Sequence, residues 1–239
     1  MSGAALSVVD LTVRFRGNTA LDSVSLDVAP GAVTGLVGLN GAGKSTLLNA
    51  ISGFVRPCQG RVLLGGQDVT ATPPEARAAA GLGRTFQGGS VFGALTVGEN
   101  LRAFSLAENR RADRGRMADF VRAYGGGTDL GAAVRELPAG VRKLVGFTAL
   151  LADAVRVALI DEPTSGLTES EYEPVMKAIA DLGAAGAAVV LVEHNLRVVR
   201  ALCPETVYME AGRVAMHGPT DEVLGSDLVT TAYVGEARA

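Results

Sequence analysis

The most constraining feature of this 239-residue chain is a glycine-rich segment at residues 38–45, Gly-Leu-Asn-Gly-Ala-Gly-Lys-Ser. It fits the G-x-x-x-x-G-K-[ST] pattern of a phosphate-binding loop. A short apolar run at 32–38 precedes the loop and a helix-forming run at 44–52 follows it, which is the strand–loop–helix context that this motif requires. Glycines let the backbone approach an anion closely, and successive N–H groups at the helix N-terminus would cradle a phosphate chain.

Two side chains of this loop supply chemistry beyond the backbone. Lys44 is expected to reach the β- and γ-phosphates of a nucleotide, and the Ser45 hydroxyl is expected to ligate Mg²⁺. A glycine-rich turn that matches the pattern by accident has odds of roughly one in a hundred or less. We therefore predict that the nucleotide contacts Gly38, Asn40, Gly41, Ala42, Gly43, Lys44, Ser45 and Thr46.

A pair of carboxylates lies far downstream of the loop. The apolar run 157–160 reads as a buried strand and ends in Asp161-Glu162-Pro163. Neighbouring side chains of a strand point in opposite directions, so Asp161 can hold Mg²⁺ while Glu162 polarises the attacking water. An Asp-Glu-Pro string can also be an ordinary exit from a strand into a turn. Its position after a buried strand, in a chain that carries a phosphate loop, favours nucleotide hydrolysis.

With their connecting sequence, these elements resemble the ATP-binding subunit of ABC transporters over nearly the whole chain. The string Gly83-Arg-Thr-Phe-Gln87 is similar to the glutamine loop of that family, and Val192-Glu-His194 is similar to its switch-histidine loop. The resemblance implies that Gln87 senses Mg²⁺ and the attacking water, and that His194 contacts the γ-phosphate. It also implies that Phe15 stacks on adenine. The implied cofactors are ATP and Mg²⁺.

The resemblance further implies the fold and its division. We expect an α/β fold of the P-loop NTPase (ABC ATPase) type, with a RecA-like core, an antiparallel β subdomain and a helical subdomain. Residues 1–239 would form one ATP-binding domain, in which 1–87 and 152–239 build the nucleotide-binding core with the β subdomain. Residues 88–151 would build the helical subdomain. In the family, the surface near the glutamine loop docks the permease, and we expect segments 89–95 and 101–106 to serve there.

A finer resemblance is to the branched-chain (hydrophobic) amino acid importer branch. It is carried by strings at 83–87, 91–101, 193–195 and 232–237, such as Leu-Thr-Val-Gly-Glu-Asn-Leu and Ala-Tyr-Val-Gly-Glu-Ala. It implies membrane permease subunits, an extracytoplasmic solute-binding protein, and a peripheral location at the cytoplasmic face of the plasma (inner) membrane. The solute itself is not readable, because the permease and the binding protein select it.

The chain departs from the family at its signature, which in relatives reads Leu-Ser-Gly-Gly-Gln. In the family dimer this loop donates hydrogen bonds to the γ-phosphate bound by the opposite subunit. Pro138 replaces the serine and has neither a hydroxyl nor an N–H. Hydrogen bonds to a charged group contribute about 1.5–3 kcal/mol each, so the contact across the dimer should weaken. Proline suits the first turn of a helix, so a helix at 140–151 should still form. The degenerate signature comprises Leu137, Pro138, Ala139, Gly140 and Val141.

This departure suggests an asymmetric assembly. Paired with a second ABC ATPase subunit that has an intact signature, the chain would form one competent ATP site and one degenerate site. We favour such a heterodimer, while a relaxed homodimer and a largely inactive paralogue stay open. A further departure, Thr168, starts the pattern Thr168-Glu-Ser-Glu171, which predicts a helix-capping box.

Composition narrows the remaining function classes. The net charge of −3 does not favour a nucleic acid partner. No uncharged apolar run reaches the roughly 18–20 residues that span a bilayer, the first ten residues do not read as a signal peptide, and two cysteines suit a reducing compartment. A GTPase is disfavoured because an Asn-Lys-x-Asp motif is absent. An ATP-binding regulatory or scaffold subunit with weak turnover, and a soluble non-transport ABC ATPase, are the alternatives that stay open.

Overall fold

A computed structural model describes residues 3–85, 91–106, 114–151 and 155–236 of the chain. Gln87 and residues 89–90 of the predicted permease-docking segment lie outside the described residues. Within the described part, none of the helices is both long and apolar enough to cross a bilayer.

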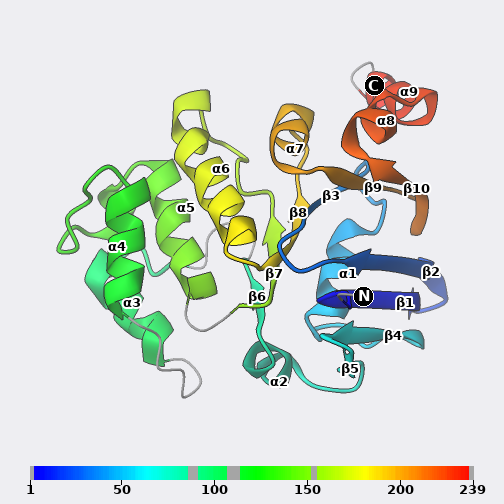
Figure 1. Ribbon diagram of the computed structural model, residues 1–239, viewed down its shortest axis with the longest axis horizontal. Coiled ribbons are helices and arrows are strands. Elements are labelled where there is room, and N and C mark those ends of the chain that lie inside the picture. Colours follow the sequence, from blue (N-terminus) through cyan, green and yellow to red (C-terminus); the bar gives the residue numbers. More distant parts are fainter. Residues whose placement is uncertain (1–2, 86–90, 107–113, 152–154, 237–239) are drawn as a thin grey trace.

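A six-stranded sheet, ordered β10-β9-β3-β8-β7-β6, forms the centre of the fold (Figure 1). The strands from β9 to β6 run parallel and β10 runs antiparallel to β9. Every residue of the three middle strands is buried, which explains why they read as uninterrupted apolar runs. The strands are β3 (Val33–Val37), β6 (Leu82–Arg84), β7 (Val157–Asp161), β8 (Ala188–Val192), β9 (Glu205–Glu210) and β10 (Arg213–Pro219).

A second, antiparallel sheet has the order β2-β1-β4-β5. Its strands are β1 (Leu6–Phe15), β2 (Asn18–Val28), β4 (Gln59–Leu64) and β5 (Gln67–Asp68). Buried and exposed positions alternate along β2, as expected for a sheet with one solvated face. The predicted antiparallel β subdomain is therefore present.

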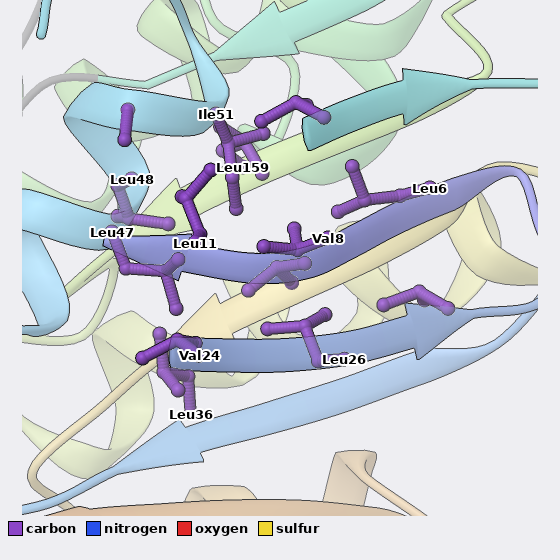
Figure 2. Packing of buried hydrophobic residues seen from close by; sticks show 14 of the residues in the cluster. Leu6, Val8, Leu11, Val24, Leu26, Leu36, Leu47, Leu48, Ile51 and Leu159 are labelled. Carbon is purple, nitrogen blue, oxygen red and sulfur yellow. The ribbon is translucent and has the colours of Figure 1, made fainter. Parts of the chain in front are cut away.

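Helix α1 (Lys44–Ile51) lies between the two sheets and fills the space with its apolar face. Figure 2 shows Leu47, Leu48 and Ile51 of α1 beside Leu11 of β1, with Leu159 of β7 close by. These side chains are buried and belong to one core cluster. The cluster fixes α1, and with it the loop that leads into α1, against both sheets.

The opposite face of the central sheet is covered by four helices, α6 (Glu169–Ala184), α7 (Leu196–Leu202), α8 (Thr220–Gly225) and α9 (Asp227–Glu236). The predicted capping box at the start of α6 is confirmed. The Glu171 carboxylate accepts hydrogen bonds from the Thr168 N–H at 3.0 Å and from the Thr168 hydroxyl at 2.8 Å. Thr168 therefore begins a helix, which accounts for a threonine at this position.

A helical region projects from the sheet edge at β6 and β7 (Figure 1). It contains α3 (Val97–Leu106), α4 (Arg114–Tyr124) and α5 (Ala139–Phe147), with the 3₁₀ turns η2 (Val134–Glu136) and η3 (Thr148–Leu151), around a small apolar cluster of its own. The expectation of one helix over 140–151 is wrong in detail. The α-helix ends at Phe147, where the Thr148 hydroxyl donates to the Val145 carbonyl at 2.6 Å, a local bond that competes with helix continuation.

Helix α2 (Pro74–Ala79) is tied to the end of α1 and to the segment after β5 through one residue, Arg77. Arg77 is 1% exposed and its guanidinium donates to the carbonyls of Ala50 and Ile51, at 2.6 Å and 2.7 Å, and of Thr70 and Thr72. The last turn of a helix leaves carbonyls without internal partners. Arg77 therefore caps the C-terminus of α1, the helix whose other end begins at the phosphate-binding loop.

Candidate nucleotide-binding site

The glycine-rich segment forms a turn between β3 and α1, as the sequence predicts. Gly43 caps the N-terminus of α1 with φ of 104°, a left-handed conformation that favours glycine. A Cβ atom on Gly38 would lie 2.3 Å from the Met209 carbonyl oxygen, so this position admits no side chain. The two glycines let the loop pass close to the sheet and then turn its amide groups toward the open side.

The loop opens onto a cleft of about 390 Å³. The N–H groups of residues 44–46, in the first turn of α1, have no helical partner four residues earlier, and such groups are suited to bind an anion. The loop from Asn40 to Thr46 lines the cleft together with Asn18, Thr19, Ala20, Glu162, His194, Ala211 and Gly212. The structure thus brings predicted loop residues and two predicted catalytic residues, more than a hundred positions apart, to one place.

A second cavity of about 320 Å³ lies between α4 and α6. Its lining is mostly apolar, with Phe120, Phe147 and Leu182 among the contributors. A phosphate chain needs N–H and cationic donors, so this cavity does not compete with the loop as the nucleotide site.

Lys44 lies inside the curve of the loop. Its ammonium donates to the Gly38 carbonyl at 2.6 Å and to the Leu39 carbonyl at 3.0 Å, and the residue is 7% exposed. The predicted contact with β- and γ-phosphates requires the ammonium to turn from these carbonyls toward the cleft. The charge is already positioned at the loop, so a small rotation of the side chain is enough.

The predicted Mg²⁺ ligands are Ser45, at the start of α1, Asp161, the last residue of β7, and Gln87, which lies outside the described residues. Asp161 is buried, and the nearest cation is Arg84, whose Nη2 lies 4.0 Å from Oδ2. Burial raises the pKa of the Asp161 carboxyl, and the Arg84 charge opposes that shift. In the described part of the chain, no group of three or more His, Cys, Asp or Glu could hold a resident metal. Ser45 lines the cleft, whereas Asp161 is buried and outside its lining. A hydroxyl and a carboxylate are oxygen ligands of the kind that Mg²⁺ takes alongside nucleotide phosphates.

Glu162 and His194 form a pair at the carboxyl ends of β7 and β8. The His194 Nε2 lies 2.9 Å from Glu162 Oε1. Glu162 has φ of 47°, a left-handed conformation that is unusual for a residue with a side chain, and its N–H donates to the Val192 carbonyl at 2.9 Å. This backbone kink separates the roles of the two acidic residues: Asp161 points into the protein, and Glu162 lines the cleft.

Phe15 and the degenerate signature lie away from the cleft lining. Phe15 is 48% exposed at the end of β1 and pairs with Asn18, which does line the cleft. Pro138 caps the N-terminus of α5 with φ of −52°, so the proline starts this helix as the sequence predicts. None of residues 137–141 lines the cleft formed by this chain's own phosphate-binding loop.

The structure also identifies polar residues that sequence reasoning did not assign to the site. Arg84 joins Asp161 to α1, donating to Asn49 Oδ1 at 2.7 Å and to Ser52 Oγ at 2.8 Å. Lys143 of α5 donates to the Glu162 and Ser165 carbonyls at 3.2 Å and 2.7 Å. Arg84 lies within the glutamine-loop string and Lys143 lies two residues after the signature, which could have marked both as candidates. Their hydrogen-bond partners, however, are set by contacts between distant segments of the folded chain.

The closing side of the cleft is built by the C-terminal segments. The Gly212 N–H donates to the Ala42 carbonyl at 3.0 Å, and the Gly38 N–H donates to the Tyr233 hydroxyl at 3.2 Å. Gly212 is in the β9–β10 turn and Tyr233 is in α9. The loop near the N-terminal end of the chain is therefore held in place by residues close to the other end.

Comparison with known proteins agrees with this geometry. The family model described as "ABC transporter" matches residues 21–165. An arabinose import ATP-binding protein of Paraburkholderia xenovorans is 35% identical over 92% of this chain and 44% of its own length, and a methionine import ATP-binding protein of Pseudomonas fluorescens is 35% identical over 87% and 65%. The lipopolysaccharide export ATP-binding protein of Haemophilus influenzae is 30% identical over 97% of both chains. The chain thus spans less than half the length of the arabinose relative.

Solved structures give the same result at the level of the fold. The ADP conformation of MJ1267, an ATP-binding cassette of an ABC transporter, superposes with a TM-score of 0.85 and 27% identity, covering 97% of this chain and 99% of that chain. The relatives are sugar and methionine importers and a lipopolysaccharide exporter, so the branched-chain amino acid branch is not singled out among them. The chain belongs to the ABC transporter family, as one of its ATPase cassettes, which bind ATP with Mg²⁺.

Proposed function

We propose that the chain is the ATP-hydrolysing motor subunit of an ABC importer for branched-chain or other amino acids. The observation that carries the proposal is the Glu162–His194 pair at 2.9 Å beside the phosphate-binding loop in one cleft. A carboxylate oriented by a histidine at the γ-phosphate end of the site can polarise the attacking water. The methionine-importing relative and the strings shared with the amino acid importer branch support the choice of solute class.

We propose a second ABC ATPase subunit with an intact signature as the partner. Pro138 begins α5 without an N–H or a hydroxyl, so it offers no donor at the position where the family serine contacts γ-phosphate across the dimer. The cleft residues of this chain would serve the competent site of such a heterodimer. The homodimer is the competing assembly.

The transporter assignment also requires permease subunits in the membrane. The segment that follows residue 90 exposes two large apolar side chains, Phe92 with an exposed fraction of 56% and Leu95 with one of 37%. Exposed apolar side chains on one short segment suit contact with another protein. We propose that this segment docks the permease at the cytoplasmic face of the inner membrane, with a solute-binding protein acting on the opposite side. We propose no nucleic acid partner.

A regulatory or scaffold subunit is the second candidate function, and Pro138 is the observation that favours it. Such a subunit would bind ATP at Lys44 and hydrolyse it slowly, because no hydrogen bond from residue 138 reaches the γ-phosphate in trans. A soluble ABC ATPase without a permease is the remaining alternative, and co-purification with a polytopic membrane protein would exclude it.

The test is to repair the signature. The triple variant Pro138→Ser, Ala139→Gly, Val141→Gln is compared with wild type for ATP hydrolysis as a function of protein concentration, each with and without Glu162→Gln. Restored hydrogen bonds to a charged group are expected to raise turnover about tenfold to a hundredfold, and Glu162→Gln should abolish it in both backgrounds.

The outcome of the repair distinguishes the heterodimer from the homodimer, and the motor subunit from the regulatory subunit. Rapid wild-type turnover that rises more steeply than linearly with concentration, and gains nothing from repair, would contradict the heterodimer. Tight ATP binding without turnover in the repaired chain would favour the regulatory subunit.

The docking of the permease has a test of its own. In cells, Phe92→Ser should reduce co-purification of the permease, whereas Leu228→Ser, at another exposed apolar position, should not.

A further inference from the structure

Glu193 occupies an unusual place between the loops that carry Glu162 and His194. The residue is 2% exposed, and its two carboxylate oxygens accept hydrogen bonds from two different segments. Oε1 accepts from the Thr164 N–H at 2.8 Å and from the Thr164 hydroxyl at 2.7 Å. Oε2 accepts from the His194 N–H at 3.2 Å and from the Asn195 N–H at 3.4 Å. One side chain therefore joins the loop after β7 to the loop after β8.

We infer that Glu193 is a positioning residue that holds Glu162 and His194 in register for hydrolysis. The inference rests on the proposed function, because it assumes that this pair acts on water and γ-phosphate. Glu193 does not line the cleft, and its hydrogen bond to His194 is made with the backbone N–H of that residue. It acts through the two loops: a shift of either loop changes the geometry of the Glu162–His194 pair.

The chemistry of the site requires a carboxylate at this position. An ionised carboxylate is an acceptor at both oxygens, and all four surrounding groups are donors. A glutamine would place its NH₂ against the N–H groups of one loop, so that loop would lose its bonds. An unpaired buried carboxylate is costly, and Lys143 provides the nearby positive charge, since its ammonium interacts with both Glu193 and Glu162. The buried Glu193 carboxylate is thus stabilised by hydrogen-bond donors from the two loops that it connects.

A purely structural role is the alternative, and the chain contains a matched case. Glu99 of α3 accepts from the Thr96 N–H at 2.7 Å and from the Thr96 hydroxyl at 3.0 Å. This pair repeats the Thr164–Glu193 chemistry within one helix cap, in the helical region and outside the cleft lining. Replacing Glu99 removes the same kind of bond without linking two loops, so Glu99→Gln is the control for a general loss of stability.

The test uses the full chain and the two histidines it contains, His194 and His217. The imidazole signals of both residues are recorded by NMR for wild type, Glu193→Gln, Glu162→Gln and Glu99→Gln, with ATP affinity and turnover measured on the same samples. We expect Glu193→Gln to move the His194 signal toward its position in Glu162→Gln. The His217 signal should not move, and the ATP affinity should stay within about twofold of wild type. Turnover should fall about tenfold to a hundredfold.

A second pair of variants keeps the test decisive if Glu193→Gln does not fold. Thr164→Val removes only the hydroxyl donor and should shift the His194 signal, whereas Thr164→Ser keeps the donor and should restore both signal and turnover. The inference is overturned if Glu193→Gln and Thr164→Val lower the melting temperature but leave the His194 signal and turnover unchanged. If the signature-repaired chain binds ATP without turnover, the proposed function fails by itself, and the His194 signal of the wild-type chain still decides the role of Glu193.

Discussion

At the scale of single residues, buried charged side chains impose the strongest constraints on this chain. Arg77 is the clearest example, because its guanidinium satisfies four carbonyls in the interior and is 1% exposed. Burial lowers the pKa of Arg77, and the charge of Asp68 opposes that shift. Removing one partner of a buried polar network leaves the other groups unsatisfied, which costs more than the bonds themselves contribute.

Arg77→Met should therefore be strongly destabilising. Methionine has a similar length but no donor, so the Ala50 and Ile51 carbonyls at the end of α1 would lose their cap. We expect the free energy of unfolding to fall by about 3–5 kcal/mol, measured by urea denaturation. Arg122→Met at an exposed i,i+3 pair should change it by less than about 1 kcal/mol. Equal effects of the two substitutions would show that the buried guanidinium is not structural.

The buried Cys203 should make the stability of the chain depend on alkaline pH. Burial, with a smaller contribution from Glu193, raises the pKa of the Cys203 thiol to about 12, against 9.0 for the unperturbed group. Between these values the unfolded chain releases a proton that the folded chain retains, so stability falls as pH rises. We expect Cys203→Ala to flatten the decline in unfolding free energy between about pH 9 and 11. A Cys203→Ala protein that keeps the wild-type slope would contradict a raised pKa of the buried thiol.

At the scale of secondary-structure elements, the close packing of α5 on α6 depends on Gly140. A Cβ atom at this position would lie 2.6 Å from the Glu171 carbonyl oxygen. Gly140 is also the glycine that the degenerate signature retains, so the packing of two helices gives a physical reason for its retention.

Gly140→Ala should push the two helices apart. Overpacking of this kind typically costs about 1–3 kcal/mol, which calorimetric melting would detect. The control is Gly225→Ala at the end of α8, where nothing lies within 4 Å of an added Cβ and alanine favours the helix. A Gly140→Ala protein as stable as the Gly225→Ala protein would mean that α5 can move freely on α6.

These elements also show how far the sequence could be read. The phosphate-binding loop and the Asp161–Glu162 pair were predictable because each is a short local pattern attached to a buried strand. The end of α5 at Phe147 was not, because the apolar pattern continues past it and one side-chain bond from Thr148 decides the boundary. The roles of Glu193, Arg84 and Lys143 depend on pairings between distant segments, which spacing in a single sequence does not reveal.

At the scale of the whole molecule, the C-terminal helix takes part in the nucleotide site. The Tyr233 hydroxyl accepts the hydrogen bond of the Gly38 N–H, 195 positions away along the chain. Tyr233→Phe should leave this amide without its partner, lowering the unfolding free energy by about 1 kcal/mol. The site-specific measurement is hydrogen exchange of the Gly38 amide, which should become faster. Exchange that is unchanged, with Tyr172→Phe as the control, would contradict this role.

The position of β3 has a consequence for how the protein is made. This strand, which leads into the phosphate-binding loop, pairs on both sides with strands that are synthesised much later, β8 and β9. While it emerges from the ribosome, β3 thus lacks both neighbours until at least residue 210 has been translated, and such long-range pairings form slowly. During translation the nascent glycine-rich loop would have no rigid support before β9 has emerged, so ATP binding would begin only after that strand has been made. Nucleotide binding would then report that β3 has paired with both of its neighbours.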